Sequence, residues 1–370
     1  MKKLLILICS LALSCFIFFG CAGTGNNGGT MCGGAPIEPI LANKPWTNSN
    51  NYEYACYDIT RYEAEKTETD FRKGDTLASG TYTTELFTVR ENIYNSDVLD
   101  KISAKSAYFK DKFENAKKLS QAPGSYSVLF SEYKLDYNDG KKDVLSSVVV
   151  FKSSSLIPVF SEKVANYQSS GLSYTATADY ANKKNIFQSS ESGVKSEVDL
   201  KNEETSFDNE LMNYVIRSHS SLKSGGSSSI SLRNSVYTGL NGSEEYRTMA
   251  FKVMSGNYAV TGIDADKTGF VSRYFNDGDV TYLDKDTTDT DGNEVKKGYQ
   301  IPCHYVQAMY NNTNSGTPKY LYYASCGFDY VGDTTSKVLL QSIDFETDET
   351  GVVSAVTLMT INDYKTSQSM

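Results

Sequence analysis

Histidine and tryptophan are scarce in this chain, and their scarcity limits the chemistry it can perform. Only two histidines, His219 and His304, and one tryptophan, Trp46, occur among the 370 residues. Enzymes that use a histidine base therefore have few ways to be built here. The sequence also lacks a nucleophile elbow, an HExxH zinc pair, a phosphate-binding loop and a dinucleotide fingerprint. We accordingly expect no catalytic residue, no metal site and no cofactor.

An excess of positive charge is also missing. The chain has 36 basic and 45 acidic residues, a formal net charge of -9. Without Lys2 and Lys3 at the start, 34 basic residues face 45 acidic ones, which gives -11. This balance argues against nucleic acid or anionic lipid head groups as the main partner.

Long hydrophobic runs are absent beyond the first 20 residues. Lys2 and Lys3 precede an uncharged stretch from Leu4 to Phe19, and the next charged residue is Glu38. A run of about 16 residues is short for a membrane span, which needs about 20. Residues 1–20 therefore have the pattern of a signal peptide for export.

The end of this run, Phe18-Phe19-Gly20-Cys21, resembles the lipobox of bacterial lipoproteins. The resemblance implies cleavage before Cys21 and a diacylglycerol on its sulfur, with fatty acyl chains such as palmitate in the cell membrane. Phe18 departs from the family, which usually has leucine there. Cys15 is a rival attachment site, but it leaves a shorter hydrophobic run. Alternatively, Cys21 is only the first residue of an ordinary secreted protein.

The chain after Cys21 divides into a tether, a body and a tail. Residues 21–51 are rich in Gly, Asn, Pro and Thr, and such a segment does not bury enough apolar area to order itself. We expect a flexible tether there, a single β-rich extracytoplasmic domain over 52–364, and a disordered tail over 365–370. The body is long enough for a large core.

The body has the composition of a mainly β protein. Its 27 tyrosines, together with many Thr, Ser and Val residues, suit strands with one buried and one wet face. Residues 125–152 predict a hairpin that turns at 138–140, with a bulge near Glu132 where the apolar register shifts. The other expected strands cover residues 52–62, 80–89, 158–167, 172–180, 186–189, 194–200, 247–254, 258–263, 269–275, 300–310, 319–330, 337–346 and 352–364.

Two helices interrupt the strands. Apolar residues at helical spacing predict an amphipathic helix over about 97–120, capped by Asp97 and stopped by Pro123. We expect its apolar face to pack on the sheet, although its lysines also fit a membrane surface. Asp208 can cap a short helix near 208–217, with Leu211 and Val215 facing inward.

A long antiparallel sheet must close or cover its edges, so we expect a wide barrel or half-barrel. The order of strand, helix and meander behind a lipobox resembles lipid-carrier lipoproteins with a half-barrel. The segment Phe207–Arg217 (FDNE…IR) resembles a stretch of uncharacterised exported β-rich domains. The first resemblance implies a hydrophobic ligand; it covers architecture only.

Two cysteines in neighbouring strands are a candidate disulfide. Cys303 and Cys326 are equally far from the centre of the loop between them, so a symmetric hairpin places them opposite each other. The alternative is two packed thiols. His304 adjoins Cys303, but neighbours in a strand point to opposite faces, which disfavours joint chemistry.

The remaining acidic and apolar patterns leave the function open. The stretch 284–294 is rich in Asp, but its spacing lacks the first and twelfth calcium ligands, so we expect a hairpin turn. Strands 300–310 and 319–330 are apolar on both faces, which predicts a covered sheet or a lined cavity. We expect a non-enzymatic, membrane-anchored lipoprotein that binds a hydrophobic or amphiphilic ligand or a surface protein. The alternatives are a carboxylate-based cell-wall or glycan hydrolase and a structural envelope protein.

Overall fold

The computed structural model describes most of the expected body. The described residues are 52–66, 71–89, 126–152, 155–180, 182–190, 193, 195–201, 206–218, 226–244, 246–263, 269–276, 278–288, 294–310, 318–326, 338–347 and 352–366. The signal peptide expected over 1–20, Cys21, the tether expected over 21–51, His219 and the helix expected over 97–120 lie outside these residues.

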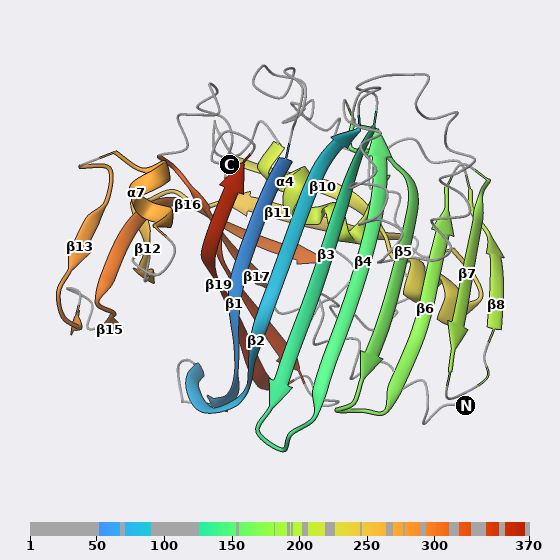
Figure 1. The fold of residues 1–370 in the computed structure, drawn as a ribbon, viewed down its shortest axis with the longest axis horizontal. Helices are drawn as coiled ribbons and strands as arrows, with labels where there is room; N and C mark the ends of the chain where they lie inside the picture. Colours follow the sequence, from blue (N-terminus) through green and yellow to red (C-terminus); the bar gives the residue numbers. More distant parts are fainter. Residues whose placement is uncertain are drawn as a thin grey trace.

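The first half of the body is a series of antiparallel hairpins (Figure 1). In order along the chain they are β1 (Tyr52–Lys66), β2 (Phe71–Val89), β3 (Tyr126–Tyr137), β4 (Lys142–Lys152), β5 (Pro158–Tyr167), β6 (Leu172–Asp179), β7 (Lys184–Ser189) and β8 (Lys195–Asp199). Side chains alternate between the two faces of a strand, so every second residue shares the buried face. In β2 these residues are Tyr82, Thr84 and Leu86, which are 5%, 4% and 1% exposed.

The second half mixes short helices with strands. Its elements are β9 (Ser206–Asp208), the 3-10 helix η5 (Asn209–Leu211), α4 (Met212–Ser218), β10 (Gly226–Arg233), α6 (Ser235–Asn241), β11 (Tyr246–Val253), β12 (Tyr258–Ile263), α7 (Phe270–Tyr274), β13 (Thr281–Leu283), β14 (Thr287–Thr288), β15 (Glu294–Val295), β16 (Gly298–Tyr310), β17 (Lys319–Ala324), β18 (Leu339–Thr347) and β19 (Val353–Thr366). The short helix expected near 208–217 is confirmed.

One 17-stranded sheet joins the two halves. Strands β8 to β1 follow one another, β19 pairs with β1, and β18, β17, β16, β11 and β10 continue the order. The described pairs are antiparallel except β9 with β10, which is parallel. The sheet curls into a barrel-like form without closing, so the expected half-barrel is confirmed.

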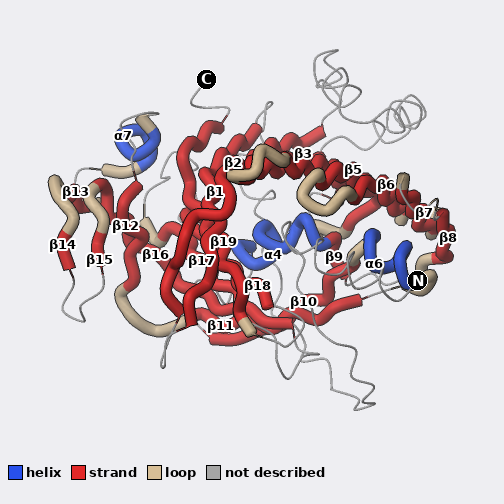
Figure 2. Tube along the Cα trace, turned by 90° about the horizontal axis from the view of Figure 1, so that it is seen from below, coloured by secondary structure: helices blue, strands red, loops and turns tan. Residues whose placement is uncertain are grey.

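The inside of the curl is occupied by the chain itself. Figure 2 shows α4, β9 and α6 between the wall formed by β2–β8 and the wall formed by β10, β11, β17 and β18. We call residues 206–218 the inner segment. Its side chains Leu211, Val215 and Ile216 are fully buried and belong to the main hydrophobic core. Their burial excludes water from the middle of the molecule.

Two local expectations were wrong. The register between β3 and β4 is continuous through Glu132, so there is no bulge. Val128 and Leu129 are both fully buried, which shows that this end of the sheet is covered on both faces. The strand expected over 269–275 is instead the helix α7, which follows Gly269 in the left-handed conformation (φ 64°).

Candidate functional site

The inner segment begins with a local capping interaction. Asp208 ends β9 in an extended conformation, and its Oδ1 accepts a hydrogen bond of 3.0 Å from the backbone N–H of Glu210. This cap starts η5 at the position expected from the sequence. Asp208, Asn209 and Glu210 are all buried, so each needs a partner inside the protein.

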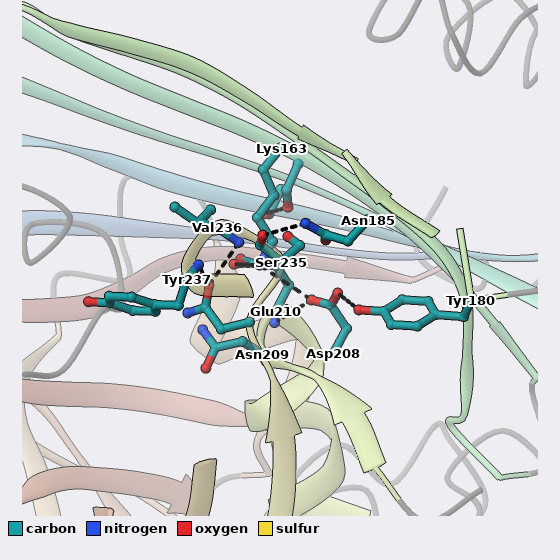
Figure 3. A network of polar contacts seen from close by, with 12 residues as sticks. Lys163, Tyr180, Asn185, Asp208, Asn209, Glu210, Ser235, Val236 and Tyr237 are labelled. Carbon is teal, nitrogen blue, oxygen red and sulfur yellow. Dashed lines mark hydrogen bonds and ion pairs between the residues drawn. The ribbon is translucent and has the colours of Figure 1, made fainter. Parts of the chain in front are cut away.

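Lys163 supplies a positive charge beside the carboxylates of Asp208 and Glu210 (Figure 3). It projects from β5, with its Nζ 3.2 Å from Glu210 Oε1 and 3.6 Å from Asp208 Oδ1. Burial alone disfavours the charged ammonium, but the attraction of the two carboxylates outweighs it and raises the pKa of Lys163. The lysine therefore stays charged and ties the inner segment to one wall.

Hydrogen bonds from both walls complete this network. The Tyr180 hydroxyl donates to Asp208 Oδ2 at 2.8 Å, and its pKa is raised well above 10.0 by burial and by Asp208. From the opposite wall, the Tyr310 hydroxyl donates to Asn209 Oδ1 at 3.1 Å. Beside them, Asn185 Nδ2 donates to the carbonyl of Ser235 in α6 (Figure 3). The two walls are thus cross-linked through the interior.

A second ionic contact holds the other end of the inner segment. Arg217 of α4 donates from both Nη atoms to the two carboxylate oxygens of Glu53 in β1, at 2.7 and 2.6 Å. Its guanidinium also lies 4.7 Å from the centroid of the Tyr214 ring. Burial opposes the charge, but Glu53 raises the pKa of Arg217 further. A bidentate pair of this kind fixes orientation as well as position.

Lys319 and Asp344 form a second lysine–carboxylate pair, in which burial has a larger effect on the pKa values than the attraction between the charges. Nζ of Lys319 lies 2.9 Å from Asp344 Oδ2, on the wall formed by β17 and β18. Burial lowers the pKa of Lys319, and Asp344 offsets only part of this. Burial also raises the pKa of Asp344 against the pull of Lys319. Both shifts favour the neutral forms, because burial outweighs the attraction between the two groups.

The network does not have the layout of a glycan hydrolase site. Asp208 and Glu210 are 0% and 9% exposed and both contact Lys163, so a polysaccharide has no access to them. Among the described residues there is no group of three or more His, Cys, Asp or Glu side chains that could hold a metal ion. We infer that the network keeps the inner segment in place.

The second cluster is a row of aromatic rings, which we call the tyrosine face. Tyr305 stacks on Tyr322 with centroids 5.0 Å apart and planes 8° apart. It meets Tyr258 edge-on at 4.9 Å and Tyr320 at 5.5 Å. Phe345 extends the row, with its centroid 5.4 Å from that of Tyr320. Rings from β12, β16, β17 and β18 therefore form one continuous array.

The tyrosine face points away from the interior. Tyr323 and Leu321 are fully buried, and the Tyr323 hydroxyl donates to the carbonyl of Asn213 in α4. Because side chains alternate along a strand, Tyr320 and Tyr322 point to the opposite, outer side. All five rings of the face are half-buried. The two apolar faces expected here are thus a covered inner face and a partly exposed outer one.

These two clusters were only partly predictable from the sequence. Alternating tyrosines in 300–310 and 319–330 marked the strands but not their exposure, and Tyr258 of β12 was missed. For the network, the FDNE stretch marked the inner segment, whereas Lys163 was overlooked. A lysine in the middle of an apolar strand was the available signal, since lysine is rarely buried without a partner.

The expected register of the two cysteines was wrong. Cys303 lies opposite Ala324, two residues from Cys326, and the side chains in the structure are thiols, not a disulfide. The hairpin is centred one residue away from the assumed point, which moves each partner by two positions. Burial raises the pKa of Cys303 to about 12, so its thiol is protonated and unreactive.

The expectation for the acidic stretch can also be compared with the structure. Thr287 pairs with Val295 and Thr288 with Glu294 in antiparallel register, as the expected hairpin requires. In the part of the chain that the structure describes, no helix is long and apolar enough to cross a bilayer.

Comparisons with known proteins give little more. No protein-family model matches this chain, and no curated protein matches its sequence. Among solved structures, the chain is similar to a beta-barrel-like protein with a domain of unknown function from Brucella abortus. The TM-score is 0.43 at 8% sequence identity, over 85% of this chain and 98% of that one. Similarity at this level carries no information on function.

Proposed function

We propose that this chain is a membrane-anchored extracytoplasmic lipoprotein that binds an amphiphilic partner through its tyrosine face. The observation that carries the proposal is the outer array of half-buried rings around Tyr305. Aromatic side chains that combine an apolar ring with a polar tip are typical of binding surfaces. Their clustering over four strands, rather than their number alone, indicates a site.

The interior is a poorer location for a ligand. In a lipid carrier the concave side of the sheet holds the cargo, but here the inner segment and α6 occupy that side. Leu211, Val215 and Ile216 fill it with packed side chains, and Lys163 and Arg217 lock it by ion pairs. We therefore place recognition on the outer face of the sheet.

The anchor is the other half of the proposal, and it rests on the lipobox at Gly20-Cys21. Two acyl chains on one cysteine give stable attachment where one chain is marginal. The negative charge of the body is consistent with a domain held outside the membrane surface, because anionic head groups repel it.

Metabolic labelling with a palmitate analogue tests the anchor, with Cys15 as the matched control. We expect the wild-type chain and the variant Cys15→Ser to be labelled and to fractionate with membranes. Cys21→Ser should lose the label. Labelling that survives Cys21→Ser but is lost in Cys15→Ser would show that the attachment site is wrong.

A further inference from the structure

The tyrosine face continues into a polar border on the same side of the sheet. Residues directly opposite each other in an antiparallel pair share a face. In register, Tyr322 of β17 lies opposite Gln341 of β18, Gln341 opposite Thr360 of β19, and Thr360 opposite Asp58 of β1. One outer row therefore runs from stacked tyrosines to an amide, a hydroxyl and a carboxylate.

These polar groups are held in fixed positions. Gln341 Nε2 donates to Thr360 Oγ1 at 3.0 Å, and Asn362 Nδ2 donates to Asp58 Oδ1 at 2.9 Å. The Gln341 amide and the Asp58 carboxylate each carry more than one hydrogen-bonding atom. The border can thus exchange hydrogen bonds with a ligand without first reorganising.

A parallel row borders the rings on the opposite side. Tyr320 lies opposite Gln307 of β16, and Gln307 lies opposite the exposed Lys252 of β11. The rings thus have hydrogen-bonding side chains at both ends. Neighbouring strands are about 4.8 Å apart, so the row from Tyr305 to Asp58 is about 19 Å long.

We infer that the tyrosine face binds a neutral polysaccharide chain, which gives the proposed function its ligand class. Each sugar ring has an apolar C–H face, which packs on an aromatic ring, and a rim of hydroxyls, which needs amides, hydroxyls and carboxylates. The outer rows present both kinds of group side by side. A lipid tail would leave the polar border unpaired, at a cost in desolvation.

Charge selects among polysaccharides. The body is acidic, and the two ends of the border contribute opposite charges, the carboxylate of Asp58 on β1 and the ammonium of Lys252 on β11. Acidic polymers are therefore repelled, whereas neutral chains meet no such barrier. Burial raises the pKa of Tyr305 to about 12, with Tyr320 adding to the shift, so its hydroxyl keeps its proton at any physiological pH. The rings remain neutral hydrogen-bonding surfaces.

Affinity electrophoresis tests this inference with the mature chain in detergent. The gels contain one of three neutral polysaccharides, galactomannan, starch or mixed-linkage β-glucan. A further gel contains polygalacturonate, an acidic polysaccharide, for comparison. We expect retardation by at least one neutral polysaccharide. Tyr305→Ala and Tyr320→Ala should weaken it about tenfold, as expected for a central ring contact. Tyr305→Phe should keep most of the binding, because the ring remains.

Tyr282→Ala is the matched control. Tyr282 is 54% exposed and contacts Tyr299 at 5.0 Å, but it lies on β13, outside the face, so its loss should have no effect. Circular dichroism of each variant verifies folding. Retardation by none of the neutral polymers, or retardation unchanged in Tyr305→Ala, overturns the inference. If Tyr305 and Tyr322 are nevertheless protected from chemical nitration in native envelopes, the proposed function stands, and only the choice of a polysaccharide as the ligand is wrong.

Discussion

Among the described residues, the guanidinium of Arg217 forms its ion pair with Glu53. Both side chains are buried, with exposed fractions of 5% and 2%. Removing one partner of a buried pair leaves the other charged and unpaired, which costs more than the pair itself contributes. Sequence reasoning could not find this contact, because the two residues are 164 positions apart. Asp208, by contrast, was found because a cap is a local interaction.

Glu53→Gln should therefore lower the free energy of unfolding by about 3 kcal/mol. Chemical denaturation of the mature chain measures the change. The control is Asp136→Asn, since the pair between Asp136 and Lys142 is 63% exposed on both sides and should contribute well under about 1 kcal/mol. Equal effects of the two substitutions would contradict the assigned role of Arg217.

Buried tyrosines and Lys163 make the fold sensitive to high pH. Burial raises the pKa of Tyr57, Tyr180 and Tyr364 well above 10.0, and the carboxylates raise that of Lys163 above 10.5. A raised pKa in the folded state contributes stability that is complete below the unfolded value. That stability is lost as the pH rises through the folded value.

We expect stability to be steady up to about pH 10 and to fall above it. The measurement is tyrosinate absorbance followed together with circular dichroism during a titration with base. The buried tyrosines should ionise in one cooperative step that coincides with loss of strand signal. Their gradual ionisation while the strands persist would be inconsistent with the burial of these side chains.

At the scale of elements, α6 approaches the sheet unusually closely. A Cβ atom on Gly239 would lie 2.1 Å from the Cβ and 2.7 Å from the Cγ of Phe187 in β7. The carbonyl of Gly239 also accepts a hydrogen bond of 2.5 Å from the Ser196 hydroxyl in β8. This close approach places α6 against the last strands of the wall.

Gly239→Ala should destabilise the protein by about 1–3 kcal/mol through overpacking. Thermal unfolding measures the loss. If steric overlap with Phe187 is the cause, Gly239→Ala and Phe187→Gly together should cost less than the sum of the two single changes, because Phe187→Gly removes the Cβ atom as well as the ring. If the destabilisation by the double substitution equals the sum of the two single ones, overlap with Phe187 is not the cause of the destabilisation.

Elements with strong periodicity were predictable, and those set by context were not. The hairpin β3–β4 and the strands β11, β12 and β19 follow from alternation alone. The stretch that forms β10 was missed because its many serines and glycines resemble a loop. α6 was missed because Ser235–Asn241 is short, although Asn234 caps it by accepting from the N–H groups of Val236 and Tyr237.

At the scale of the whole molecule, the sequence predicted a curled sheet but not what fills it. A long meander of strands must curl to protect its edges, and this follows from general physics. The return of residues 206–218 into the curl depends on contacts with β1, β5, β16 and Tyr180, which are distant in sequence. The filled interior shifts recognition from the lumen, where a carrier holds its ligand, to the outer rings.

Tyrosine nitration in native envelopes tests this central claim most directly. Tyr282 should be modified both in the purified chain and in envelopes, whereas Tyr323 and Tyr364, 0% and 1% exposed, should react in neither. Tyr305 and Tyr322 should be nitrated in the purified chain and protected in envelopes, where the partner is present. Equal nitration of Tyr305 and Tyr322 in both preparations would show that the tyrosine face is not the binding surface.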